Sequence, residues 1–138
     1  MPVTRLDVPT QHKRQLVDLT LRVAQAVRAA GLRDGAVLVW SPHTTAGITV
    51  QENADPDVQH DLLLALENAV PETAARGEYR HAEGNSDAHV KTALTGCSQL
   101  VPVENGKLVL GTWQAVYLCE FDGPRARKVY LQFLGAAA

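Results

Sequence analysis

The chain has 138 residues and a formal charge of −2, from thirteen Lys and Arg against fifteen Asp and Glu, with five histidines besides. Its length predicts one domain, and its 46% hydrophobic and 20% charged residues exclude a disordered tail, a collagen-like chain and a coiled coil. The near-neutral charge and the 5% aromatic content argue against a nucleic-acid partner, because phosphate backbones require a clustered basic surface.

No apolar run approaches the ~20 residues that cross a bilayer, and residues 1–5 do not begin a signal peptide. We therefore expect a cytoplasmic protein with no membrane partner. Cys97 and Cys119 form no C-x-x-C pair, which favours two reduced thiols packed as small hydrophobic side chains.

The first part of the chain predicts two short strands, a helix and two further strands, over residues 3–8, 15–19, 21–30, 36–40 and 46–51. Thr20 is predicted to cap the helix and Gly31 to end it. Asp34 and Gly35 are predicted to form a turn into the strand that follows.

Asp55 and Pro56 predict the start of a second helix, with an Asx cap followed by proline at the first helical position. Its apolar stripe consists of Val58, Leu62, Leu66 and Val70 and ends before Pro71. A polar stretch over residues 71–84 follows. Asn85 or Ser86 can cap a third helix, whose apolar pair is Val90 and Leu94.

The last third predicts strands over residues 100–103, 107–110, 114–121 and 128–134. Asn105-Gly106 indicates a hairpin between the first two, and residues 122–125 form a turn between the last two. Both faces of the 114–121 strand are apolar in the middle, which is typical of a central strand. Antiparallel hairpins at both ends with helices between them predict the α+β class.

Three polar clusters lie at the ends of these elements. The first runs from Ser41 to Gly47 and, through a strand, to Asp57. Glu52 shares the strand face of Ile48 and Val50, so its half-buried carboxylate would need a cation, a metal or hydrogen-bond donors. Asp55 and Asp57 are equally explained as a helix cap and a first-turn charge.

The second cluster runs from Tyr79 to Lys91 and leads through Gly84 into a helix N-terminus, where free N–H groups can bind an anion. His81 and His89 could share a divalent metal with His43, because imidazole is a common ligand of such ions. For the Asp87–Lys91 pair alone, the sequence favours a solvated salt bridge.

The third cluster, Gly111 to Gln114, opens the central strand. Gln114 and Glu120 either line a site or satisfy backbone groups at the sheet margin. His12 and His60 are predicted to be solvated. The five histidines could reverse the sign of the protein's charge, but three of them fall in the polar clusters, so we interpret them as a site rather than as a pH sensor.

Four motifs together closely resemble the YjbQ-like family, secondary thiamine-phosphate synthases: residues 42–46 (PHTTA), 52–58 (ENADPDV), 83–89 (EGNSDAH) and 111–114 (GTWQ). The resemblance covers about residues 15–133. It implies a β-sandwich-like core with about three helices, a homotrimer, and sites formed in part at subunit boundaries. The implied reaction joins hydroxymethylpyrimidine diphosphate to thiazole phosphate and releases diphosphate.

The resemblance implies a site formed by His43, Thr44, Glu52, Asp57, Asn85, Asp87, His89 and Gln114. Asn85, Ser86 and Lys91 are expected to bind the diphosphate. A divalent metal, zinc or magnesium, is expected on His43, His81 and His89, and would neutralise the leaving group. The chain has few Arg and Lys near these motifs, which predicts a weak or promiscuous synthase.

Two other functions fit the same residues. One is a metal-dependent hydrolase of a small phosphorylated or ester substrate, in which a metal-bound water is the nucleophile and Glu52 or Asp57 the base. The other is a non-catalytic trimer that binds a small anion. In each of the three functions the partner is a small metabolite.

Overall fold

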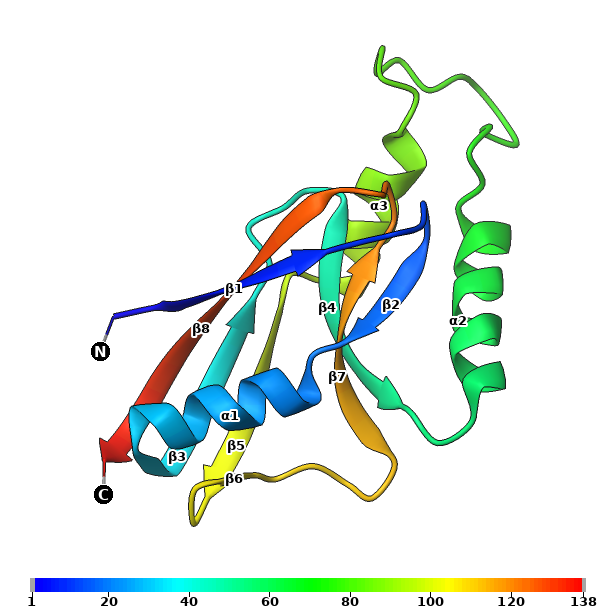
Figure 1. Ribbon diagram of the computed structural model, residues 1–138. Coiled ribbons are helices and arrows are strands. Elements are labelled where there is room, and N and C mark those ends of the chain that lie inside the picture. Colours follow the sequence, from blue (N-terminus) through cyan, green and yellow to red (C-terminus); the bar gives the residue numbers. More distant parts are fainter. Residues whose placement is uncertain (1, 138) are drawn as a thin grey trace.

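The computed structural model describes residues 2–137 and contains three helices and eight strands (Figure 1). In chain order they are β1 Thr4–Pro9, β2 Gln15–Asp18, α1 Thr20–Ala30, β3 Leu32–Trp40, β4 Ala46–Glu52, α2 Pro56–Ala69, α3 Ser86–Thr95, β5 Ser98–Glu104, β6 Lys107–Leu108, β7 Gln114–Glu120 and β8 Ala126–Ala137. The predicted α+β class with three helices is confirmed.

The strands form two antiparallel sheets. One has five strands in the order β1-β8-β3-β5-β6, and the other has three in the order β2-β7-β4. The inner faces of both sheets contribute to one apolar core, together with Leu19 and the buried side of α1, Val23 and Val27. Burial of these alternating side chains holds the two sheets together as a sandwich.

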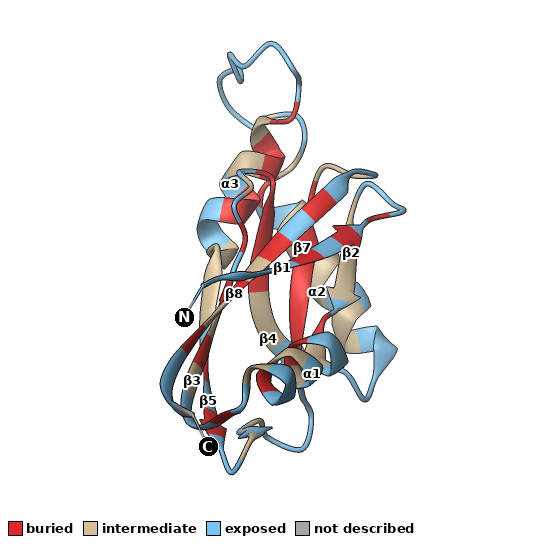
Figure 2. Ribbon diagram, turned by 60° about the vertical axis from the view of Figure 1, so that its left-hand side comes forward, coloured by how far each residue is buried: buried red, intermediate tan, exposed pale blue. Residues whose placement is uncertain are grey.

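β7 is the central strand of the smaller sheet, as predicted from its two apolar faces. Val116 and Leu118 belong to the core between the sheets. Cys119 and Phe121 face the other way and pack with Ala88 of α3 and with Leu63 and Leu66 of α2. Figure 2 shows this strand buried along nearly its whole length. In this position burial raises the pKa of the Cys119 thiol to about 12.

Two local predictions are wrong. Asp34 and Gly35 lie inside β3 instead of forming a turn, and a Cβ on Gly35 would come within 2.0 Å of the Leu134 carbonyl oxygen. The glycine therefore permits close approach of β3 and β8 rather than a change of direction. Thr20 is the first residue of α1, not its cap, and its hydroxyl accepts a hydrogen bond from the Val116 N–H.

Other local signals are confirmed. The Asp55 carboxylate accepts a hydrogen bond from the Asp57 N–H at the start of α2. Gly31 ends α1 with a positive φ. Asn105 and Gly106, with φ of 52° and 76°, form the turn between β5 and β6. No helix in residues 2–137 is long and apolar enough to span a membrane.

The apolar pair predicted for α3 does not lie on its buried side. Val90 and Leu94 are exposed, whereas Asp87, Ala88, Lys91 and Thr92 are buried. Both sets recur at i,i+4 spacing, so periodicity alone could not distinguish them. The charged pair is buried beside the Glu67 carboxylate and the Arg14 guanidinium, which come from elsewhere in the chain. Local sequence does not reveal these contacts.

Candidate functional site

A polar cavity of about 420 Å³ opens where the β3–β4 loop, the N-terminus of α3 and the start of β8 meet, at the upper end of the molecule in Figure 1. The side chains around it come from three separate stretches of the sequence. They are Pro42, His43, Thr44, Thr45, His81, Glu83, Asn85, His89, Arg125 and Arg127. Its volume lies within the range of small-molecule sites.

The β3–β4 loop is held in place by Ser41, which is buried. The Ser41 hydroxyl donates to the Ala46 carbonyl at 2.7 Å, and its backbone N–H donates to the Cys97 carbonyl at 2.8 Å. These bonds close a short loop that presents His43 and Thr44 to the cavity. Site residues on a loop fixed at both ends are positioned by the rigid sheets beneath them.

The imidazole ring of His43 is held in place by a backbone hydrogen bond. Its Nε2 accepts a hydrogen bond of 2.9 Å from the Lys128 N–H, which places the proton of the neutral ring on Nδ1. Burial lowers the pKa of His43, and the nearby Arg127 guanidinium lowers it further. His43 is therefore a neutral hydrogen-bond donor through Nδ1 near pH 7.

His81 and His89 lie edge to face with ring centroids 5.4 Å apart. His89 belongs to the first turns of α3, and His81 belongs to the loop that precedes it. Ser86 and Val90 line an adjoining hollow of about 330 Å³ beside the same two rings. The two imidazoles thus form one wall between the polar cavity and a more apolar hollow.

The predicted three-histidine metal site is not formed within this chain. His43, His81 and His89 line one cavity, but residues 2–137 contain no group of three His, Cys, Asp or Glu side chains that could hold a metal ion. The Nε2 of His43 is also occupied by the Lys128 N–H. Zinc ligands must lie ~2.0–2.1 Å from the metal, so the residues present do not fit this ion.

Asn85 occupies the N-cap position of α3, but its side chain does not cap the helix. Its Nδ2 donates to Asp122 Oδ2 at 2.7 Å, and its Oδ1 is enclosed without a partner among the described residues. Burial alone would raise the pKa of Asp122, but the hydrogen bonds from Asn85 and Arg125 outweigh it and leave that pKa below its usual value. The helix end is left without a side-chain cap, where backbone N–H groups attract anions.

Of the two arginines that line the cavity, Arg127 was not predicted from the sequence. Arg127 is 5% exposed and pairs with Glu120, which is fully buried. Burial alone would raise the pKa of Glu120, but hydrogen bonds from Arg127 and Thr10 outweigh it and lower that pKa. Glu120 shares a strand face with Val116 and Leu118, and a carboxylate on a buried face predicts a cationic partner. That signal could have led to Arg127.

Four of the eight predicted catalytic residues line the cavity: His43, Thr44, Asn85 and His89. Glu52 and Gln114 do not, because they pair with each other at the far end of β4 and β7, whereas Ala46 pairs with Glu120 at the cavity end. Six residues of strand separate the two ends, about 20 Å.

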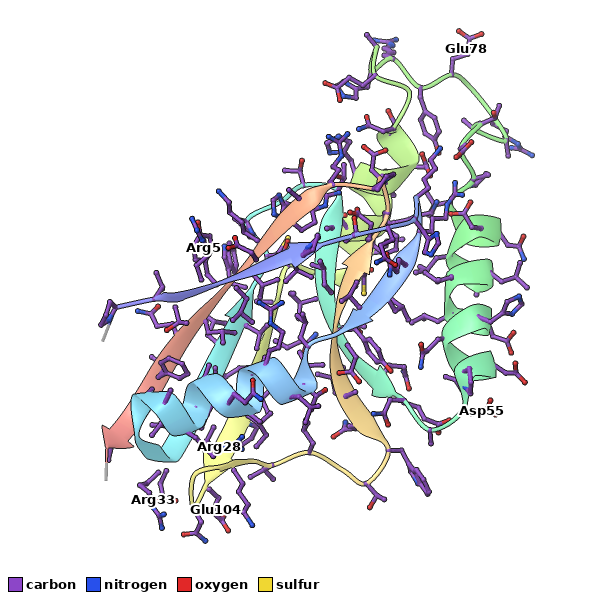
Figure 3. The ribbon with its side chains drawn as sticks, viewed as in Figure 1. Arg5, Arg28, Arg33, Asp55, Glu78 and Glu104 are labelled. Atoms are coloured by element: carbon purple, nitrogen blue, oxygen red, sulfur yellow. The ribbon has the colours of Figure 1, made fainter. Side chains whose placement is uncertain are left out.

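Asp57 lies at the same far end as Glu52, in the first turn of α2. Figure 3 shows the neighbouring Asp55 at the lower end of α2 and Glu78 at the opposite end of the molecule, in the loop that leads to α3. Within one chain, the carboxylates considered as a general base are therefore remote from the histidines.

Asp87 and Lys91 also lie outside the cavity lining. The Lys91 ammonium is fully enclosed and donates to Glu67 and, at 2.6 Å, to Asp87. Arg14, which precedes β2, is the other cation of this cluster and lies against Glu67. The expectation of a solvated Asp87–Lys91 salt bridge is wrong, because α2 and the segment before β2 cover the pair.

Comparison with known proteins agrees with this architecture. The family model described as "UPF0047 protein YjbQ-like" matches residues 4–136. The UPF0047 protein YugU of Bacillus subtilis is 46% identical, covering 94% of this chain and 97% of that protein. A UPF0047 protein of Methanocaldococcus jannaschii is 43% identical, covering 95% and 93%.

Solved structures show the same fold. A crystal structure of a YjbQ/UPF0047 family protein from Clostridium acetobutylicum matches with a TM-score of 0.90 and 49% identity, covering 95% of this chain and 99% of that one. A YbjQ-like protein of Sulfolobus solfataricus matches with a TM-score of 0.91 and 30% identity, covering 98% and 97%. The chain therefore belongs to the YjbQ-like UPF0047 family.

Proposed function

We propose that the polar cavity binds a small phosphorylated metabolite and that the protein is a weak thiamine-phosphate synthase. The observation that carries this proposal is the convergence of three imidazoles, two guanidinium groups and an uncapped helix N-terminus on one cavity. Each of these groups stabilises negative charge. The particular reaction is taken from the motif resemblance.

In the proposed reaction, the bond between the pyrimidine methylene carbon and the diphosphate oxygen breaks. Diphosphate leaves with the bonding electrons, and the thiazole nitrogen bonds to the carbon. The barrier falls when fixed donors stabilise the charge that develops on the leaving oxygen. The N-terminus of α3, His89 and Arg125 are the candidates for that role, and magnesium would enter with the diphosphate as part of the substrate.

The charge balance of the cavity supports a modest rate. Arg127 is paired with Glu120, and Arg125 is paired with Asp122 at 3.0 Å. Because both cations already have carboxylate partners, the cavity offers less net positive charge to a diphosphate than a cluster of free arginines would.

The test is an assay of purified protein with both phosphorylated precursors and Mg²⁺. We expect product from the native protein, at least tenfold less from His89→Ala, and an unchanged rate from His60→Ala, whose ring lies on the exposed side of α2. Absence of product from the native protein would overturn the synthase proposal. Equal rates in native protein and His89→Ala would remove the assigned site. Phosphate binding without turnover would favour the non-catalytic alternative.

We also propose a homotrimer assembled through the outer face of the five-stranded sheet. Leu38, Trp40 and Tyr130 line a shallow apolar hollow on that face. Trp40 is 45% exposed, and Leu100 and Leu134 on the neighbouring strands are 60% and 47% exposed. A contiguous apolar surface of this kind favours a protein contact, and Trp40 lies three residues from His43 of the cavity.

Sedimentation measurements test this assembly. We expect a mass of about three times 14.9 kDa for the native protein and a smaller species for Leu100→Lys, because a charge would be buried at the contact. Lys107→Glu, on β6 at the edge of the same sheet, is the control for a change of charge. A monomeric native protein would overturn the proposal.

A further inference from the structure

Arg127 is the most constrained cation of the cavity. Its Nε donates to Glu120 Oε1 at 2.8 Å, and its Nη2 donates to Glu120 Oε2 at 2.5 Å and to the Thr45 hydroxyl at 2.8 Å. This is a two-point pairing of guanidinium and carboxylate, which fixes the plane of the group as well as its position.

Glu120 is fixed in turn. Its Oε1 accepts a second hydrogen bond of 2.7 Å from the Thr10 hydroxyl, and its Oε2 accepts one of 3.1 Å from the Asp122 N–H. The carboxylate thus receives donors from three different segments of the chain. Arg127 cannot turn without breaking bonds at a group that is fully buried.

One nitrogen of Arg127 remains available. Nη1 makes no hydrogen bond to the described part of the chain, yet it is not among the enclosed polar atoms that lack a partner. It therefore retains access to solvent, and Arg127 as a whole is only 5% exposed. Arg127 is one of the residues that line the polar cavity.

Arg125 differs in each of these respects. It is exposed, and its contacts go to Asp122, through Nε to the carbonyl at 2.8 Å and through Nη2 to the carboxylate at 3.0 Å. An exposed, flexible side chain loses conformational entropy when it binds a ligand. The side chain of Arg127 has already lost its conformational entropy on folding. A hydrogen bond from Nη1 to a ligand therefore costs less entropy than one from Arg125.

We propose that Arg127 is the principal residue that binds the anionic ligand in this cavity and that its Nη1 receives the phosphoryl oxygens of that ligand. The proposal deepens the function proposed above and rests on it for the class of ligand, a phosphate ester or diphosphate. Glu120 and Thr45 hold the guanidinium in the orientation that presents Nη1.

The test is calorimetric titration of the native protein with inorganic phosphate and with diphosphate at constant ionic strength. Arg127→Lys keeps the positive charge beside Glu120 but lacks the planar guanidinium group with its fixed set of donors. We therefore expect phosphate affinity to fall by about tenfold or more. The matched control is Arg14→Lys, which alters an arginine that also contacts carboxylates but lies outside the cavity lining. We expect this control to bind phosphate with native affinity.

If Arg127→Lys does not fold, the double variant Glu120→Gln with Arg127→Gln removes both buried charges together and takes its place. A folded double variant that has lost phosphate binding supports the proposal. Native affinity in either Arg127 variant, or no phosphate binding by the native protein, overturns it. Phosphate binding that depends on Arg127, in a protein that forms no thiamine phosphate, upholds this inference and overturns only the synthase proposal.

Discussion

The protein buries two clusters, each of which contains both cationic and carboxylate side chains. The clusters differ in whether a hydrogen-bond donor of the cation stays accessible to a ligand. At the cavity, the Arg127–Glu120 pair retains one guanidinium nitrogen with access to solvent. Between α2 and α3, the Lys91 cluster, consisting of Lys91, Asp87, Glu67 and Arg14, encloses its ammonium completely. A lysine with two carboxylate partners has few donors left for a ligand, whereas an arginine has five donors and can divide them. The comparison indicates that burial alone does not mark a functional charge.

The largest expected effect comes from breaking the cavity pair. Arg127→Met leaves the Glu120 carboxylate buried without its cation, and we expect a loss of about 4 kcal/mol in the free energy of unfolding. Chemical denaturation measures this change. Adding Glu120→Leu should recover most of the loss, because the second substitution removes the unpaired charge. A double variant as unstable as Arg127→Met would mean that packing, not charge, is what the arginine supplies.

Removing the lysine cation of the Lys91 cluster should reduce the free energy of unfolding by less than Arg127→Met does. In Lys91→Met, Arg14 remains 3.9 Å from Asp87 and in contact with Glu67, so the carboxylates keep one cation. We expect a loss of about 2–3 kcal/mol in the free energy of unfolding. Phosphate affinity, measured by calorimetry on the folded variant, should stay at the native value. A large fall in affinity would contradict the division between the two clusters.

Acid should weaken the cavity pair. Because the pKa of Glu120 is lower in the folded chain than its ordinary value of 4.5, its contribution to stability is complete above about pH 4.5. That contribution is lost as the pH falls below 4.5 and through the lower pKa of the folded state. Between pH 7 and pH 3, the free energy of unfolding should therefore fall less in the Glu120→Gln, Arg127→Gln double variant than in the native protein. Chemical denaturation measures both values. Equal losses would contradict the assignment.

The smallest effect is expected at an exposed ion pair beside the Lys91 cluster. Lys13 pairs with Glu72, and both side chains are nearly half exposed. Hydrogen bonds from Lys13 and Arg14 lower the pKa of Glu72, but water and salt screen a pair in this position. Lys13→Ala should change the free energy of unfolding by about 0.5 kcal/mol or less, measured by denaturation at low and high salt. A loss as large as that of Lys91→Met would show that the exposed pair supports the buried one.

Most of the regular elements could be predicted from the sequence alone, because their signals are local. Asp55-Pro56, Gly31 and Asn105-Gly106 each fix a helix end or a turn through the backbone angles and hydrogen bonds of a few residues. The two apolar faces of residues 114–121 likewise identified the central strand. The family motifs also placed His43, Thr44, Asn85 and His89, which line the cavity.

Which charges are buried and which strand ends meet depends instead on contacts between distant segments of the chain. Arg127 reaches Thr45 across 82 positions, and Lys91 reaches Glu67 across 24, and no local pattern encodes either contact. Strand pairing also places Glu52 of β4 and Gln114 of β7 at the end of the small sheet opposite the histidines, although both belong to the same motif set as His43 and His89. A buried charge is stable only beside its partner, so the packing of distant segments determines which charged residues can be enclosed and which can face a ligand.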